Sequence, residues 1–215
     1  MSTLTKIALS LVGHMKPDRV KERSAATLEL PPAEKRGGLP VLEALATRRS
    51  GREFAPTPLP PQVLSNLLWA AFGINRSASG GRTAPSAQNA QEIDVYAALA
   101  GGLYIYDAKS HVLRLVAEVD ARRVTGYQDF VDEAPLDLIY VADNAHMGVV
   151  SEGVRVEFSA ASAGAIAQNV YLYCASVGLT TVIRGWFDRT ALATALRLSP
   201  GEYVLLTQTV GYPRG

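Results

Sequence analysis

The chain has 215 residues, of which 48% are hydrophobic and 19% charged, a composition that suits one globular domain with a sizeable core. Its 21 basic and 20 acidic residues leave a net charge of +1, which argues against nucleic acid or an anionic membrane as the main partner. No segment approaches the ~20 apolar residues of a transmembrane helix. The apolar run at residues 7–12 is shorter than a signal-peptide core of ~7–15 residues. We therefore expect a cytoplasmic protein.

Residues 1–38 are expected to form an N-terminal arm. Apolar residues recur there at helical spacing and predict an amphipathic helix. They are Leu4, Ile7, Ala8, Leu11 and Val12. The rest of the arm is charged and then rich in Pro and Gly, which is typical of an extended linker. Such an arm has too little apolar surface for its own core. We expect it to pack on the main domain or to wrap a partner subunit.

The main domain is predicted at residues 39–215, and it opens with two helices. Residues 41–48 form the first. Several prolines precede the second, whose apolar stripe reaches Phe72 and which Gly73 terminates. Residues 75–89 are rich in Ser, Gly, Asn and Pro and are expected to form a loop. A loop of that length inside a compact domain is a hint of function.

Strand and helix signals then follow one another without strict βαβ alternation. The expected strands are residues 93–98, 103–106, 112–116, 136–142, 179–183 and 203–212. The expected helices are residues 120–132, 158–177 and 189–196. This order predicts an α+β fold with helices on a mostly antiparallel sheet. The helix at 158–177 is rich in Ala and Gly, so we expect it to be deeply buried or to lie at a subunit interface.

Motifs that carry hydrolytic, metal or nucleotide chemistry are absent. The sequence has no G-x-G-x-x-G, P-loop, H-E-x-x-H, C-x-x-C or G-x-S-x-G motif. The histidines, His14, His111 and His146, lack metal-ligand spacing, and the single cysteine, Cys174, is expected to be a core residue. We therefore expect no catalytic side chain and no bound metal. If the protein is an enzyme, an organic cofactor supplies the chemistry.

The segment Arg48-Arg49-Ser50-Gly51-Arg52 puts three guanidinium groups into five residues. Such groups repel one another unless they are solvated or neutralised by an anion, and Arg presents fixed donors that match a phosphate. Taken alone, the segment favours a positively charged helix end. Three further polar segments, each typical of a turn or loop when taken singly, are residues 82–89, 181–187 and 210–214.

Together these segments resemble the nitroreductase superfamily of FMN-dependent oxidoreductases, and most closely its branch of SagB-type azoline dehydrogenases. The matching phrases, in family order, are RRSGREF (48–54), LSNLLWAAFGINR (64–76), GGRTAPSAQN (80–89), GLYIYDAKSHVLRLV (102–116), AQNVYLYCASVGL (167–179) and VGYPRG (210–215). They cover roughly residues 39–215. The resemblance implies a nitroreductase-like α+β fold and an intertwined homodimer with FMN at the subunit interface.

The resemblance also assigns FMN contacts to this chain. Arg48 and Arg214 stand where the family binds the phosphate. Arg49 and Ser50 stand where it contacts the ribityl chain and the pyrimidine edge. Arg52 stands where positive charge lies near N1 and O2 of the ring.

Further positions complete the implied site. Gln128, placed in the helix expected at 120–132, is another candidate for the pyrimidine edge. At Arg184 and Gly185 the backbone N–H groups are expected to meet flavin N5 and O4. The loop expected to reach the flavin of the other subunit contains Pro85, Ser86, Ala87 and Asn89.

The implied activity is a ping-pong reaction in which NAD(P)H passes a hydride to flavin N5 and a small acceptor, such as a nitroaromatic or a quinone, is then reduced. Two alternatives stay open: an azoline-type dehydrogenase or oxidase whose substrate reduces FMN, and a flavin-binding protein without turnover. The azoline branch commonly has Gly-Ala-Leu-Tyr-Pro where this chain has Gln-Asn-Ala-Gln-Glu at residues 88–92. The substrate class therefore does not carry over.

Overall fold

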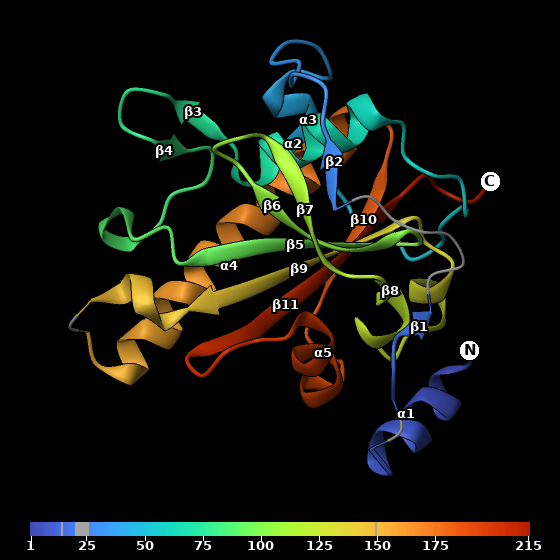
Figure 1. The fold of residues 1–215 in the computed structure, drawn as a ribbon. Coiled ribbons are helices and arrows are strands. Elements are labelled where there is room, and N and C mark those ends of the chain that lie inside the picture. Colours follow the sequence, from blue (N-terminus) through green and yellow to red (C-terminus); the bar gives the residue numbers. More distant parts are fainter. Residues whose placement is uncertain (14, 20–25, 149) are drawn as a thin grey trace.

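The central element of the fold is a seven-stranded sheet in the order β10-β11-β9-β5-β6-β7-β2 (Figure 1). The computed structural model describes residues 1–13, 15–19, 26–148 and 150–215. Every neighbouring pair in the sheet is antiparallel, as the sequence predicts. The strands are β2 (Thr27–Glu29), β5 (Ile93–Leu99), β6 (Gly102–Asp107), β7 (Val112–Ala117), β9 (Leu136–Asp143), β10 (Thr180–Arg184) and β11 (Glu202–Gly211).

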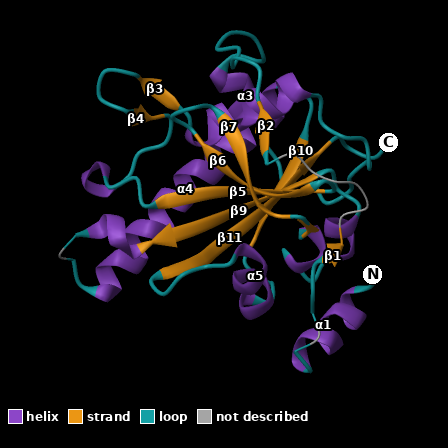
Figure 2. Ribbon diagram, viewed as in Figure 1, coloured by secondary structure: helices purple, strands orange, loops and turns teal. Residues whose placement is uncertain are grey.

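Helices cover the sheet, and two short strand pairs extend from it (Figure 2). The α-helices are α1 (Thr3–Leu11), α2 (Val41–Thr47), α3 (Pro61–Phe72), α4 (Glu152–Ser176) and α5 (Arg189–Leu196). The strand pairs are β1 (Asp18–Arg19) with β8 (Val119–Asp120), and β3 (Ile74–Arg76) with β4 (Gly81–Arg82). The 3-10 helices are η1 (Ala87–Asn89), η2 (Arg122–Val124), η3 (Asp129–Asp132) and η4 (Asn144–Met147).

Strand β9 is covered on both faces, which explains its nearly continuous apolar sequence. Side chains alternate between the faces of a strand. Leu138 and Tyr140 accordingly join the core between the sheet and helices α3 and α4. Ile139 and Val141 join the second core, which lies between the sheet and α5. The single cysteine, Cys174, is buried in the first core, as predicted.

Helix α4 begins six residues before the start that the sequence predicts, at Glu152 instead of residue 158. Its added first turns are mostly polar or glycine, so no apolar stripe marks them. Farther along, Ala163 and Ala167 are buried against the core. Ala160 and Gly164 are exposed. One face of the helix therefore packs in the core, and the other exposes small side chains to the outside.

Two expectations for local structure are wrong. Residues 75–89 are not one long loop, because they contain most of the β3–β4 hairpin and η1. Residues 120–132 do not form one α-helix but the short 3-10 helices η2 and η3. Arg122 pairs with Asp120 and donates to the carbonyl of Ala134 at 2.8 Å, while Thr125 Oγ1 donates to the carbonyl of Arg122. Such local side-chain bonds compete with a continuous helix.

The N-terminal arm packs on the main domain of its own chain. Helix α1 confirms the predicted helix, and β2 continues the sheet by pairing with β7, so that Leu28 lies opposite Leu113. A role of the arm in wrapping a partner stays a prediction. Within the described residues, no helix is long and apolar enough to cross a membrane.

The two-sided burial of β9 predicts a large cost for a cavity at its centre. Replacing Leu138, which is fully buried, by Ala is expected to lower the free energy of unfolding by about 2–5 kcal/mol. Leu4→Ala is the matched control, because Leu4 is 80% exposed and its truncation is expected to change stability by less than about 0.5 kcal/mol. Urea denaturation checks both values. Equal losses in the two variants would contradict the assignment of β9 to the core.

Candidate cofactor site

Residues 48–52, the arginine segment, follow helix α2 and lie along strand β10. The N–H of Gly51 donates to the carbonyl of Thr181 in β10 at 3.1 Å. A Cβ at Gly51 would lie 1.9 Å from Oγ1 of Thr180, so only glycine lets the segment approach the strand this closely. Because this contact fixes the backbone, the neighbouring arginine side chains start from a defined position.

Tyr171 of helix α4 joins the arginine segment to β10, and the sequence alone did not single it out. Its hydroxyl lies 2.8 Å from Ser50 Oγ and accepts a hydrogen bond from the N–H of Ile183 at 3.0 Å. The guanidinium carbon of Arg48 lies 5.4 Å from the centre of the tyrosine ring, within cation–π range. Tyr171 is buried on the core-facing side of α4, where a tyrosine is usually only a core side chain.

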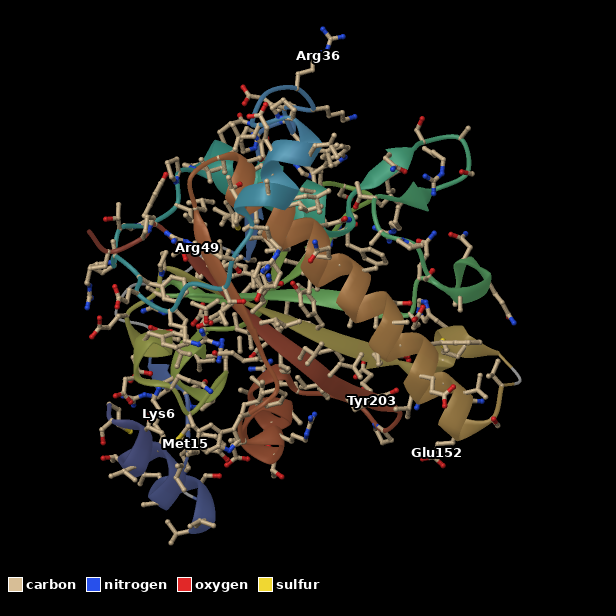
Figure 3. All side chains as sticks on the ribbon, turned by 180° about the vertical axis from the view of Figure 1, so that it is seen from behind. Lys6, Met15, Arg36, Arg49, Glu152 and Tyr203 are labelled. Carbon is tan, nitrogen blue, oxygen red and sulfur yellow. The ribbon has the colours of Figure 1, made fainter. Side chains whose placement is uncertain are left out.

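The arginine segment is rich in positive charge that no carboxylate of the described residues neutralises. Arg49 and Arg52 are exposed and Arg48 is half-buried. Within the described residues, none of the three forms an ion pair with a carboxylate. Figure 3 shows Arg49 far from Glu152, which begins α4 at the other end of the molecule.

The C-terminal residues lie against the arginine segment. The N–H of Arg214 donates to the carbonyl of Glu53 at 3.1 Å, and Phe54 forms a bridge with Pro213. The Arg214 side chain pairs with Glu133 at 2.5 Å, and both side chains are 55% exposed. An exposed pair of this kind contributes little energy and is readily exchanged. The backbone of Arg214 is therefore held next to Glu53, the residue that follows the arginine segment.

The side chain of Arg184 is buried and turned into the protein. Its Nη2 lies 2.5 Å from Oδ1 of Asp137 in β9, and its Nη1 donates to the carbonyl of Thr125 at 2.7 Å. Burial raises the pKa of Asp137, and the guanidinium of Arg184 acts in the opposite direction. The side chain is thus committed to a structural ion pair. At this turn the Arg184 side chain is therefore not available to a ligand, whereas the next residue, Gly185, is exposed.

Gln128 lies beside Arg184, but not within a helix as expected. It precedes η3, in a segment, residues 126–132, that we name the cofactor loop. A Cβ at Gly126 would lie 2.0 Å from Arg184 Nη1 and 2.5 Å from Gln128 Oε1, so these groups are close together. Within the described residues, Gln128 Oε1 is buried and has no hydrogen-bond partner. Phe130 of the same loop packs on Phe54, with 5.3 Å between ring centres.

Residues 85–89, the distal loop, lie away from this cluster. The loop follows the β3–β4 hairpin on one side of the molecule, while the C-terminus lies on the other (Figure 1). Its exposed residues are Pro85, Gln88 and Asn89; Ser86 and Ala87 are half-buried. Ser86 Oγ accepts from the N–H of Gln91 at 3.0 Å. Gln88, Asn89 and Gln91 have φ values of 55°, 54° and 52°, which are uncommon for residues other than glycine.

The structure therefore brings most of the predicted positions together and separates the rest. The clustered residues are Arg48, Arg49, Ser50, Arg52, Gln128, Arg184, Gly185 and Arg214. Those on the distal loop are Pro85, Ser86, Ala87 and Asn89. For metals, no group of three or more His, Cys, Asp or Glu within the described residues could hold an ion, and His14 lies outside those residues.

Comparisons with known proteins establish the family of the chain. The sequence model of the Nitroreductase family matches residues 45–212. A curated protein of Methanocaldococcus jannaschii, named "putative nitroreductase", is 30% identical over 194 residues, and the match covers 86% of this chain and 95% of that protein. A crystal structure from Ralstonia eutropha JMP134 with the same description is 47% identical, with a TM-score of 0.89, and the match covers 94% of this chain and 96% of that one.

A third protein, the NADPH:FMN oxidoreductase of Vibrio harveyi in complex with NAD+, shares the fold. It is 19% identical, with a TM-score of 0.59 over 81% of this chain and 69% of that one. The particular likeness to azoline dehydrogenases stays a prediction. With the family model matching more than half of its length, the chain belongs to the nitroreductase family.

Proposed function

We propose that the protein is an FMN-dependent oxidoreductase that uses NAD(P)H to reduce a small electron acceptor. The observation that carries the proposal is the arginine segment, whose guanidinium groups form no ion pair within the described residues. A phosphate is the type of anion that such a group of donors neutralises. Membership in the nitroreductase family and the fold shared with an NADPH:FMN oxidoreductase support the choice of FMN.

The chemistry of Gln128 fits a flavin. A buried acceptor without a donor costs about 1–3 kcal/mol, so Oε1 of Gln128 favours a ligand that carries an N–H group. The pyrimidine edge of a flavin carries such a donor. Arg184 holds this part of the site in place, because its guanidinium occupies the space beside Gly126.

FMN, when bound, supplies the capacity to accept a hydride from NAD(P)H and to pass electrons on to an acceptor. This chain's residues hold and tune it. Arg48 and Arg214 are the proposed phosphate ligands, and the weak surface pair of Arg214 with Glu133 leaves that arginine available. Arg49 and Ser50 are proposed for the ribityl chain and the pyrimidine edge. Arg52 would place positive charge near the ring, which favours the reduced, anionic form.

We further propose that two chains complete each site. The distal loop lies apart from the arginine segment of its own chain, so a second chain is needed to supply its residues, as the resemblance implies. Helix α2 exposes apolar side chains that a partner would bury: Val41, Leu42 and Leu45 are 62%, 76% and 48% exposed. Helix α4, which packs on α2, adds its outward small residues, and small side chains permit close helix contact.

Loss of cofactor from arginine variants tests the assignment of the arginine segment. We expect the purified protein to show flavin absorbance. Arg48→Ala is expected to weaken FMN binding by about ten- to a hundredfold, because a charge-assisted contact contributes about 1.5–3 kcal/mol. Arg52→Ala is expected to retain more FMN and to lower its reduction potential, because the positive charge near the ring is lost. Fluorescence titration and spectroelectrochemistry measure the two effects.

Arg197→Ala is the matched control for those variants, since Arg197 is also exposed but follows α5 instead of α2. It is expected to bind FMN as the wild-type protein does. Full flavin content in both Arg48→Ala and Arg52→Ala would show that the arginine segment is not part of the site.

Reduction by a nicotinamide separates the proposed activity from its alternatives. Under anaerobic conditions, NADH or NADPH is expected to bleach the flavin absorbance, and a quinone or nitroaromatic is expected to restore it. A flavin that neither nucleotide reduces would point to a substrate-driven dehydrogenase or to a flavin-binding protein without turnover. Stopped-flow absorbance spectroscopy measures both half-reactions.

A further inference from the structure

Helix α1 lies outside residues 45–212, the part that matches the family, yet it has a fully buried lysine. Lys6 Nζ donates to the carbonyl of Gln128 at 2.8 Å and to that of Gly126 at 3.4 Å. It also lies 2.7 Å from Oδ1 of Asp132. All three acceptors belong to the cofactor loop.

Most other polar contacts of the N-terminal residues with the main domain also reach the cofactor loop. The amino group of Met1 lies 2.6 Å from Oδ2 of Asp132, and Thr3 Oγ1 donates to Asp129 at 2.7 Å. Ser10 Oγ lies 2.8 Å from the hydroxyl of Tyr127 in the loop, and it also donates to Asp188, which caps the N-terminus of α5. Figure 3 shows Lys6 where α1 meets the main domain.

Apolar burial accounts for only part of the packing of this helix, in which Leu9 contacts the second core. Leu4 and Leu11 are 80% and 83% exposed, whereas Lys6 is inaccessible to solvent. Lysine is almost never fully buried unless its charge is paired. Burial lowers the pKa of Lys6, and Asp132 acts in the opposite direction. The position of α1 therefore depends on a specific set of oxygen acceptors, which must keep their places around the ammonium group.

Those acceptors lie directly behind the proposed flavin contacts. The loop carries Gln128, whose Oε1 has no hydrogen-bond partner in the described part of the chain, and Gly126, which faces the guanidinium of Arg184. The N–H of Tyr127 lies 3.4 Å from the carbonyl of Trp186, the residue after Gly185, and the two rings pack with centres 5.2 Å apart. A shift of the cofactor loop would thus move both the amide of Gln128 and the turn at Gly185.

We propose that α1 positions the cofactor loop, and that Lys6 does so by holding the carbonyls of Gly126 and Gln128. Lys6 is a positioning residue, since it acts through Gln128 and not on the ligand itself. The inference rests on the proposed function, because it takes FMN as the ligand of the loop. If docked α1 raises the affinity of the loop for FMN, thermodynamic linkage requires that bound FMN stabilises the docking of α1 to the same extent.

Lys6→Met in the full chain tests the proposal, because methionine keeps the apolar stem and removes the donors. FMN binding, measured by fluorescence titration, is expected to weaken by about tenfold or more. Leu4→Ala, on the exposed side of the same helix, is expected to bind as the wild type does. Leu113→Ala in β7 controls for a general loss of stability: its side chain is fully buried in the core on the α3 and α4 face, and its folded form is expected to keep wild-type affinity.

Hydrogen exchange of the wild-type chain gives a readout that does not require a variant to fold. Added FMN is expected to slow amide exchange in residues 3–11 as well as in the cofactor loop. In the protein without FMN, Lys6→Met is expected to speed exchange of the loop. Unchanged exchange in α1 on adding FMN, or equal FMN affinity in Lys6→Met and the wild type, would overturn the positioning role while leaving the proposed function intact. A wild-type chain that binds no FMN would overturn both.

Discussion

The buried ion pair between Arg184 and Asp137 is the interaction on which the site depends. Arg184 ends β10, the edge strand beside the arginine segment, and Asp137 lies in β9, at the middle of the sheet. The pair is completed by the carbonyl of Thr125 and the hydroxyl of Thr209. Removing one partner of such a pair leaves an uncompensated charge and costs about 3–5 kcal/mol. It therefore ties the end of β10 and the start of the cofactor loop to the most buried strand.

Three further contacts extend the site from this pair, two on one side and one on the other. Gly51 approaches β10 closely enough to place the arginine segment along it, and Tyr171 braces that segment from α4. On the other side, Lys6 holds the loop that contains Gln128. The exposed guanidinium groups of Arg49 and Arg52, which could meet a ligand, are thus carried on backbone that buried contacts fix. That separation of roles is what a preorganised binding site requires, because little remains to be ordered when the ligand arrives.

Sequence patterns predicted the fold correctly where the local pattern of residues and their packing in the fold favour the same element. Strand β9 is apolar on both faces, and α5 spans the residues that its pattern predicts. The patterns failed where side-chain contacts decide the local structure. Residues 120–132 have a helical pattern, but hydrogen bonds from the side chains of Arg122 and Thr125 to backbone carbonyls replace a continuous helix there. Site positions came from resemblance, which could not show that the Arg184 side chain is buried. Lys6 carried no signal, because a single lysine in an amphipathic helix normally faces solvent.

Subunit complementation tests the central claim, which is that the arginine segment of one chain and the distal loop of another form one flavin site. One variant carries Arg48→Ala with Arg52→Ala, and the other carries Ser86→Ala with Asn89→Gly, where glycine accepts the positive φ of Asn89. Each alone is expected to lose most of its FMN. Heterodimers purified through two different tags are expected to recover about one FMN per dimer, because one of their two sites is intact. Heterodimers without recovered FMN, or a wild-type monomer that binds FMN fully, would contradict the account.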